Sequence, residues 1–358
     1  MSPDGLKMTS YFGERQRVGG RFWSDVLLDT FAEYDVNTSI LLRATGGFGL
    51  RHHLRGDQTL TLSEDPSVMA VAVDTKERIE GLAPRVAELH THGLLTLERA
   101  QIVRAEQATV APQPSGPLHE ETKLTIYVGR YERVGRIPAH VAVCELLRTH
   151  GVAGASVLSG VDGTSHGVRE RARFFDRNVD VPTVILAVGG PIQRVLPELP
   201  GLLARPIITV ERVRVCKRDG QLLARPDALP ATDSAGLGVW QKLMIYTSES
   251  HLHEGHPVHR ALLRRLRSGP ARGATSLRGV WGFTGDHEPH GDHLLRVGRR
   301  VPVVTVLVDT PERVAASFEV VDELTQEHGL VTSEMVPAAA YLTDQGWHGG
   351  LRLASLDY

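Results

Sequence analysis

Hydrophobic and polar positions along the chain repeat in three similar blocks. Each block opens on a short strand-like run: MTSYFGE from Met8, LTIYVGR from Leu124 and LMIYTSE from Leu243. These runs start 116 and 119 residues apart, and the loop glycines Gly47, Gly163 and Gly282 repeat at the same two spacings. Because two independent landmarks share one pair of spacings, we expect three copies of one structural unit.

Within each block the periodicity predicts the order strand, helix, strand, strand, helix, strand. The first helix has apolar residues three and four positions apart, such as Leu27 and Phe31, which predicts one buried stripe. Nearly continuous β-branched runs at 68–73, 181–188 and 301–308 are typical of covered or central strands. Pro197 and Pro200 interrupt the second helix of the second copy, and they predict that this helix is broken or short.

This order is that of the split βαβ, ferredoxin-like unit, an α+β arrangement whose antiparallel sheet carries both helices on one face. We expect three tandem ferredoxin-like (βαββαβ) domains at residues 6–103, 122–217 and 242–337. Stretches rich in Pro or Gly at 104–121 and 218–241 are predicted linkers, and 338–358 is a predicted C-terminal tail.

One face of each predicted sheet is left uncovered by its own helices. A ring of three domains would bury all three faces, so we predict a monomeric pseudo-trimer within one chain. The alternative is a string of separate domains, each of which trimerises between chains.

Composition excludes several classes of protein. In 358 residues, 40 Lys and Arg balance 42 Asp and Glu, which leaves no basic surface for nucleic acid. Only five basic residues are lysines, which we interpret as a compositional bias. Two cysteines, Cys144 and Cys216, exclude a disulfide scaffold and a Cys-rich zinc site. With no secretory signal and no bilayer-length apolar run, a cytoplasmic protein without membrane insertion is expected.

The second and third copies carry the residues of a known family. LTIYVGR from Leu124 with GVAGASVLSG from Gly151, and RGATSLRGVWGF from Arg272, resemble the PII-like family known as domain-of-unknown-function family 190. The first copy keeps Gly47-Phe48-Gly49 but has Asn37-Thr38-Ser39 where the other copies have a Gly-Ala step. The resemblance covers most of the chain.

The resemblance implies a relative of the PII signalling proteins, which are trimers that bind adenine nucleotides between subunits. A long loop between their second and third strands engages a partner, and it corresponds here to residues 46–58, 160–173 and 279–293. Family members are often encoded near fluoride-export channels, which implies a link to ion homeostasis and a membrane transporter or an enzyme as partner.

Glycines and arginines near these loops are suited to a small anionic effector. Glycine allows close backbone approach to an anion, and arginine adds a charge-assisted grip. The predicted nucleotide- or anion-binding set is Arg43, Gly47, Gly163, Arg169, Arg212, Arg214, Arg278 and Gly282. The alternative is that these arginines are simply solvated. No Walker-type loop is present, so no catalytic residue is assigned and no cofactor is expected to be required.

The third copy is rich in histidine. His287, His290 and His293 supply nitrogen donors for zinc or copper, and the alternative is a solvated surface loop. Each copy also ends on a strand with one glutamate: Glu98, Glu211 and Glu334. Three carboxylates near a pseudo-threefold axis would suit a cation, but we favour solvent exposure or pairing with a neighbouring arginine.

These observations predict a non-enzymatic PII-like signalling and regulatory protein. A small anionic effector, with an adenine nucleotide favoured, would bind in inter-domain clefts and order a loop that acts on a partner. The alternative is a metal-binding homeostasis protein that uses the third copy. A third option is an enzyme with an inter-domain active site, because fold alone does not exclude one.

Overall fold

Three α+β domains follow one another along the chain, joined by a continuous antiparallel sheet. The computed structural model describes residues 5–49, 55–56, 65–90, 92–103, 120–171, 181–284, 290–291, 301–343 and 346–356. Within this part of the chain, no helix is both long enough and apolar enough to span a bilayer.

Each domain contains four long strands and its helices in the predicted order. Domain 1 consists of β1 (Gly5–Gly13), α1 (Trp23–Glu33), β4 (Thr38–Arg43), β7 (Ser67–Thr75), α2 (Lys76–Leu89) and β8 (Gly93–Val103). Domain 2 consists of β9 (Glu120–Gly129), α3 (Ala139–Thr149), β12 (Gly154–Ser159), β15 (Pro182–Val188), α4 (Ile192–Val195), α5 (Leu199–Leu202) and β16 (Ile207–Arg218). Domain 3 consists of β18 (Trp240–Ser248), α6 (Val258–Arg267), β21 (Ala274–Arg278), β24 (Pro302–Asp309), α7 (Pro311–Leu324) and β25 (Leu330–Val336).

Shorter strands decorate these units. Two-residue hairpins precede the first helix of each domain: β2 (Arg17–Val18) with β3 (Arg21–Phe22), β10 (Arg133–Val134) with β11 (Ile137–Pro138), and β19 (Leu252–His253) with β20 (His256–Pro257). The loops after the second long strand contain β5 (Gly46–Phe48), β6 (Arg55–Gly56), β13 (Asp162–Ser165), β14 (Val168–Arg171), β22 (Trp281–Thr284) and β23 (His290–Gly291). β17 (Gln221–Leu222) follows β16.

The strand order is the same in all three domains. β1 lies between β8 and β7, and β4 pairs with the far side of β7, every pair being antiparallel. The orders β16-β9-β15-β12 and β25-β18-β24-β21 repeat this arrangement. The predicted break in the second helix of domain 2 is confirmed, because Pro197 and Pro200 leave only the short α4 and α5.

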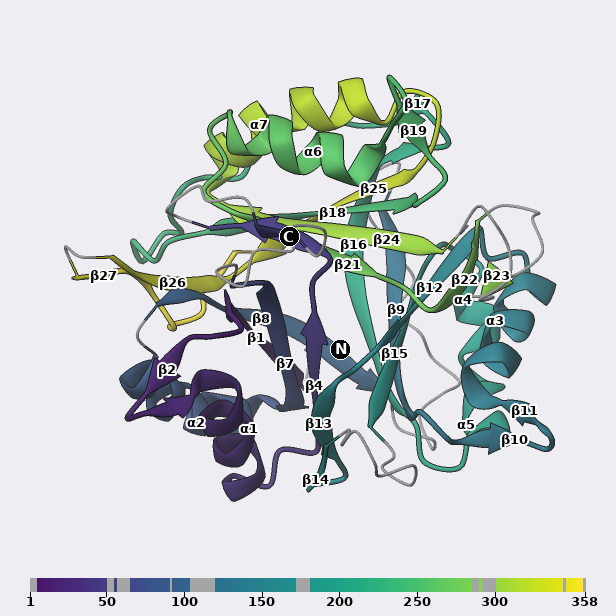
Figure 1. Ribbon diagram of the computed structural model, residues 1–358, viewed down its shortest axis with the longest axis horizontal. Coiled ribbons are helices and arrows are strands. Elements are labelled where there is room, and N and C mark those ends of the chain that lie inside the picture. Colours follow the sequence, from purple (N-terminus) through teal and green to yellow (C-terminus); the bar gives the residue numbers. More distant parts are fainter. Residues whose placement is uncertain are drawn as a thin grey trace.

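The three sheets face one another across a shared core. In Figure 1 the helices lie on the outside, with α6 and α7 above, α1 and α2 at lower left and α3 at right. One buried cluster contains side chains from all three domains, including Val71, Val184 and Val304. Three further clusters lie between each sheet and its own helices. The sheet faces opposite the helices therefore meet in one buried cluster that all three domains share.

Two sets of strand pairs join neighbouring domains. The loop strands cross over: β5 pairs with β21 of domain 3, β13 with β4 of domain 1, and β22 with β12 of domain 2. The last long strands also pair at their ends, β8 with β16 and β16 with β25.

The region predicted as a C-terminal tail completes this second set. β26 (Ala338–Thr343) pairs with β8 of domain 1, and β27 (Gly346–Gly350) folds back on β26. The sequence prediction missed this hairpin because its strand character depends on the edge that domain 1 offers it.

Candidate functional site

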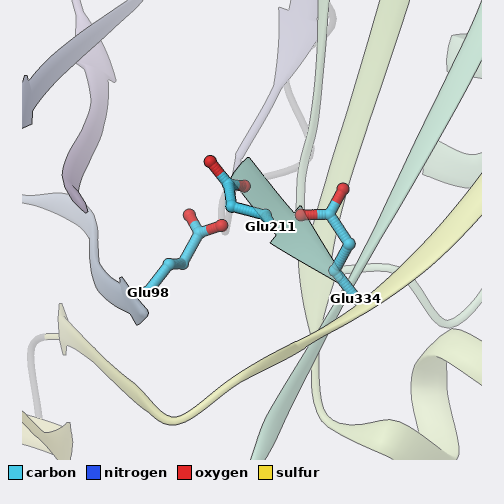
Figure 2. A group of neighbouring side chains, drawn as sticks. All are labelled: Glu98, Glu211 and Glu334. Carbon is cyan, nitrogen blue, oxygen red and sulfur yellow. The ribbon is translucent and has the colours of Figure 1, made fainter. Parts of the chain in front are cut away.

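Six charged side chains meet where the three sheets converge. The three last-strand glutamates point toward one another in Figure 2 and are buried. Each faces a lysine of the first strand in its own domain: Lys7 opposite Glu98, Lys123 opposite Glu211, and Lys242 opposite Glu334. The positive charges beside these carboxylates are therefore the ammonium groups of the protein's own lysines. The expectation that the glutamates face solvent or pair with an arginine is wrong.

The ion pairs form a closed ring through all three domains. Lys7 lies 3.3 Å from Glu98 of its own domain and 2.7 Å from Glu211 of domain 2. Lys123 in turn contacts Glu211 and Glu334, and Lys242 contacts Glu334 and Glu98. Three positive and three negative charges alternate, so the buried cluster is neutral. An unpaired buried charge would be costly, and each group here has two partners.

The ring shifts the pKa values of Glu98 and Lys7 toward their charged forms. Burial alone would raise the pKa of Glu98, but Lys242, Lys7 and Lys123 outweigh burial and hold this pKa at about 2. Burial disfavours the ammonium of Lys7, yet Glu211 and Glu98 raise its pKa above the usual value. Glu98 and Lys7 therefore stay charged at neutral pH, whereas burial lowers the pKa of Lys123 despite its contacts with Glu211 and Glu334.

A cavity of about 60 Å³ adjoins this ring, with Tyr11 and Tyr127 in its lining. Burial and then Glu98 raise the pKa of Tyr11, so its hydroxyl stays protonated. The cavity holds a few water molecules at most, which makes it too small for an organic effector. The ion-pair ring therefore holds the three domains together, and the candidate ligand sites are the larger clefts at the domain boundaries.

The cleft between domains 1 and 3 has a volume of about 780 Å³. Domain 1 contributes Tyr11–Gly13 at the end of β1 and Phe48 of β5. Domain 3 contributes Trp240 of β18 and residues 272–275 before and within β21. The hairpin strand β26 adds Tyr341 to the lining. Clefts of 300–1,000 Å³ with apolar walls and a few polar groups are typical of small-molecule sites.

One arginine contacts two aromatic rings in this cleft. The Arg272 guanidinium carbon lies 5.6 Å from the centre of the Trp240 ring and 5.1 Å from that of Tyr341. The two rings meet edge to face at 5.7 Å, and Arg272 donates a hydrogen bond to the Tyr341 hydroxyl at 2.8 Å. Cation–π contacts of this kind hold the guanidinium in place. We call these three residues the aromatic–arginine trio.

Domain 3 fixes the arginine from the other side. Asp309 at the end of β24 accepts a hydrogen bond from the Arg272 backbone at 2.9 Å, and its carboxylate lies 3.4 Å from Nε. Burial raises the pKa of Asp309 despite these contacts. Arginine has five N–H donors, and the Asp309 and Tyr341 contacts leave further donors for an anion in the cleft.

A second inter-domain cleft, between domains 1 and 2, has a volume of about 610 Å³. Its lining includes Tyr127–Gly129 at the end of β9, the counterpart of Tyr11–Gly13, and Thr38 of domain 1. Tyr131, His166 and Arg205 also line it. This cleft therefore has a different set of side chains from the cleft between domains 1 and 3.

The three predicted loop glycines have a structural role at the inter-domain strand pairs. A Cβ on Gly163 would lie 2.3 Å from the Ser39 carbonyl oxygen, and one on Gly282 would lie 2.3 Å from that of Ala155. A Cβ on Gly47 would lie 2.9 Å from the Ala274 carbonyl oxygen. Only glycine permits such close approach between backbones. The repeat of these glycines therefore reflects ring closure, and anion binding by them stays a prediction.

The predicted arginines do not converge on one place, and each has a carboxylate partner. Arg43 pairs with Glu14, Arg212 with Glu120, Arg214 with Asp227 and Arg278 with Glu249. Arg169 of domain 2 contacts Asp162 and two aspartates of α1, Asp25 and Asp29. These pairs link elements and domains, and anion binding by these arginines stays a prediction.

The predicted histidine site falls largely outside the described residues. His287 and His293 lie beyond them. His290 is described only through its backbone, which pairs in β23 with Gly282 of β22. Metal binding by this group stays a prediction.

Sequence reasoning missed both the lysines of the ring and the aromatic–arginine trio. A signal for the lysines was present, because Lys7, Lys123 and Lys242 are spaced by the same 116 and 119 residues as the repeats. The trio had no comparable signal, since Trp240 and Tyr341 lie in the predicted linker and tail.

The chain is remotely similar to several solved structures. An aspartate kinase from Synechocystis matches at 10% identity and a TM-score of 0.29, covering 96% of this chain. The chain spans 45% of the length of that kinase. An anthrone oxidase-like protein matches at 14% identity over 71% of this chain and 100% of its own, with a TM-score of 0.18. Likenesses at these scores carry no argument about function.

The family comparison is much more specific. The pattern of DUF190, a PII-like family described as "Uncharacterized ACR", matches residues 5–102, 121–215 and 240–338. These three matches cover most of the chain and coincide with the three structural domains. The chain therefore belongs to the DUF190 family, of which it carries three tandem copies.

Proposed function

We propose that this protein is a PII-like regulatory protein that senses a small anionic effector, an adenine nucleotide being favoured, between its domains. Each domain is in this proposal a ferredoxin-like PII unit, and the three units together replace a homotrimer. The strand order β8-β1-β7-β4 and its two repeats support this assignment.

The observation that carries the proposal is the cleft between domains 1 and 3. Its aromatic walls suit the flat face of a nucleobase, and Arg272 supplies donors for a phosphate. Its volume of about 780 Å³ is ample for a nucleotide. Because both domains contribute to the lining, a bound effector would contact two domains at once.

Regulation follows from the position of the loop strands. β5 lies at the base of the loop after β4, and its Phe48 lines the cleft. An effector that contacts this strand would bias the loop between two states, because a ligand stabilises the state that it binds better. The ordered loop would then act on a partner such as a membrane transporter or an enzyme, with fluoride homeostasis as the proposed setting.

Thermal unfolding in the presence of ligands tests this proposal. ATP, ADP, AMP and cyclic nucleotides are each added at millimolar concentration, and zinc and copper are tested in parallel for the metal-binding alternative. A nucleotide present at 100 times its Kd stabilises the folded state by about 2.7 kcal/mol and raises the unfolding temperature. If no nucleotide shifts the transition, the proposed function is overturned, and a shift with zinc alone favours the alternative.

A further inference from the structure

The three inter-domain junctions of this chain are related by the repeat, and two of them hold the clefts described above. Equivalent positions of the three junctions can be compared by strand register. Tyr341 of β26 pairs with Leu94, which pairs with Tyr11 in β1. Arg218 of β16 pairs in the same way with Leu330, which pairs with Tyr246 in β18. Arg218 therefore occupies, between domains 2 and 3, the position that Tyr341 occupies between domains 3 and 1.

The other two members of the trio also have counterparts. Trp240 and Glu121 each lie two residues before the ring lysine of their domain. Arg272 lies two residues before the start of β21 pairing, and Ala153 lies at the same point before β12 pairing. The junction of domains 2 and 3 therefore has Glu121, Ala153 and Arg218 in place of the trio.

These replacements change the chemistry of that junction. Arg218 donates a hydrogen bond to Glu121 at 2.9 Å, so the two side chains pair across positions that are aromatic in the other cleft. With alanine at the third position, no guanidinium projects from this strand end.

A linker side chain also packs into the same region. Leu223, Tyr246 and Leu330 pack against the buried cluster Val188, Val213 and Val215. Val308, Tyr11 and Leu94 are the counterparts of Val188, Tyr246 and Leu330, and all three line the open cleft. Backbone hydrogen bonds from residues 223 and 224 to the Cys216 carbonyl hold the linker in place. Leu223 thus covers a surface that stays accessible between domains 1 and 3.

The cleft between domains 1 and 2 lacks the trio in another way. Its counterparts of Trp240 and Arg272 are Gly5 and Asn37, which offer neither an aromatic ring nor a positive charge. The Asn37 backbone donates to Asp74 as the Arg272 backbone donates to Asp309, which confirms the equivalence. The counterpart of Tyr341 is residue 104, which lies outside the described residues.

From these differences we propose that the chain has one effector site, the cleft between domains 1 and 3, and that Trp240, Arg272 and Tyr341 define it. This inference rests on the proposed function and makes it specific. A symmetric trimer must keep three identical clefts, whereas this tandem chain keeps the trio in one cleft, lacks it in the cleft between domains 1 and 2, and packs Leu223 between domains 2 and 3. One bound effector then acts on the three-domain assembly asymmetrically, through the loop that begins at β5.

Isothermal titration calorimetry with ATP, ADP and AMP tests the inference. The wild-type chain is expected to bind one nucleotide, and Arg272→Ala and Tyr341→Ala to weaken binding at least tenfold. Tyr341→Phe keeps the ring and should lose less affinity than Tyr341→Ala. The matched control is Arg218→Ala at the equivalent position of the next cleft, which should change the Kd less than twofold.

The possible failures are distinguishable. Two or three nucleotides per chain, or an Arg218→Ala variant weakened as much as Tyr341→Ala, would overturn the single-site inference and leave the proposed function standing. No binding to the wild type overturns both. Thermal unfolding of each unliganded variant shows whether that variant folds. If a variant does not fold, the number of nucleotides bound per wild-type chain still tests the single-site inference.

Discussion

Lys7 of β1 and Glu211 of β16 form a 2.7 Å ion pair across 204 residues of sequence and a domain boundary. Two equivalent pairs, Lys123 with Glu334 and Lys242 with Glu98, complete the ring. Each lysine therefore contacts one glutamate of its own domain and one of a neighbouring domain. Each buried charge therefore gains its second partner only when all three domains assemble correctly.

The first prediction concerns this ring. Glu211→Gln leaves Lys7 and Lys123 each short of one carboxylate in a buried site, so the free energy of unfolding should fall by about 3–5 kcal/mol. Urea denaturation followed by circular dichroism measures the change. The control is Glu319→Gln, which removes an exposed pair with Arg225 and should leave the transition unchanged. Equal effects of both substitutions would contradict a stabilising ring.

The second prediction concerns acid. The pKa of Glu98 is lowered from 4.5 to about 2 in the folded state, so its charged form stabilises the fold. This contribution is fully present above pH 4.5 and is lost as the pH falls from 4.5 toward 2, and it amounts to about 3 kcal/mol.

Glu98→Gln is the matched variant for this acid test. Between pH 5 and pH 2.5, the wild type should lose more stability in urea titrations than the variant. Identical pH dependence of the two proteins would show that Glu98 is not held charged by the lysines.

The third prediction concerns the inter-domain strand pairs. In Gly163→Ala, the added Cβ would lie 2.3 Å from the Ser39 carbonyl oxygen and push β13 away from β4. Overpacking of this kind costs about 1–3 kcal/mol, to be measured as a lower urea midpoint. Gly190→Ala is the control, because nothing lies within 4 Å of its Cβ position. An unchanged urea midpoint in Gly163→Ala would show that the β13–β4 strand pair separates without cost.

The fourth prediction concerns assembly. Because all three sheet faces are buried within one chain, the protein should be a monomer of 39.1 kDa by light scattering after size exclusion. A mass of three chains would support the alternative of domains that trimerise between chains.

Much of the fold was predictable because it depends on local periodicity. The spacing of apolar residues predicts the three blocks and their helices. Pro197 and Pro200 predict the broken helix of domain 2. The hairpin β26–β27 was not predictable, since its pairing partner β8 lies in the first domain.

The site was harder to predict than the fold, because its members come together only on ring closure. Trp240, Arg272 and Tyr341 lie at a linker edge, before a strand and in the tail, with no common motif. The lysines were interpreted as a compositional bias, although their spacing repeats that of the domains. The close approach of Gly163 and Gly282 to neighbouring backbones was also missed, and anion binding by the loop glycines stays a prediction.

A crystal structure of the chain grown with ATP, ADP or AMP tests the central claim most directly. We predict nucleotide density in the cleft between domains 1 and 3, with the base against Trp240 or Tyr341 and a phosphate near Arg272. Density in the cleft between domains 2 and 3, or no nucleotide density in any inter-domain cleft, would contradict the account.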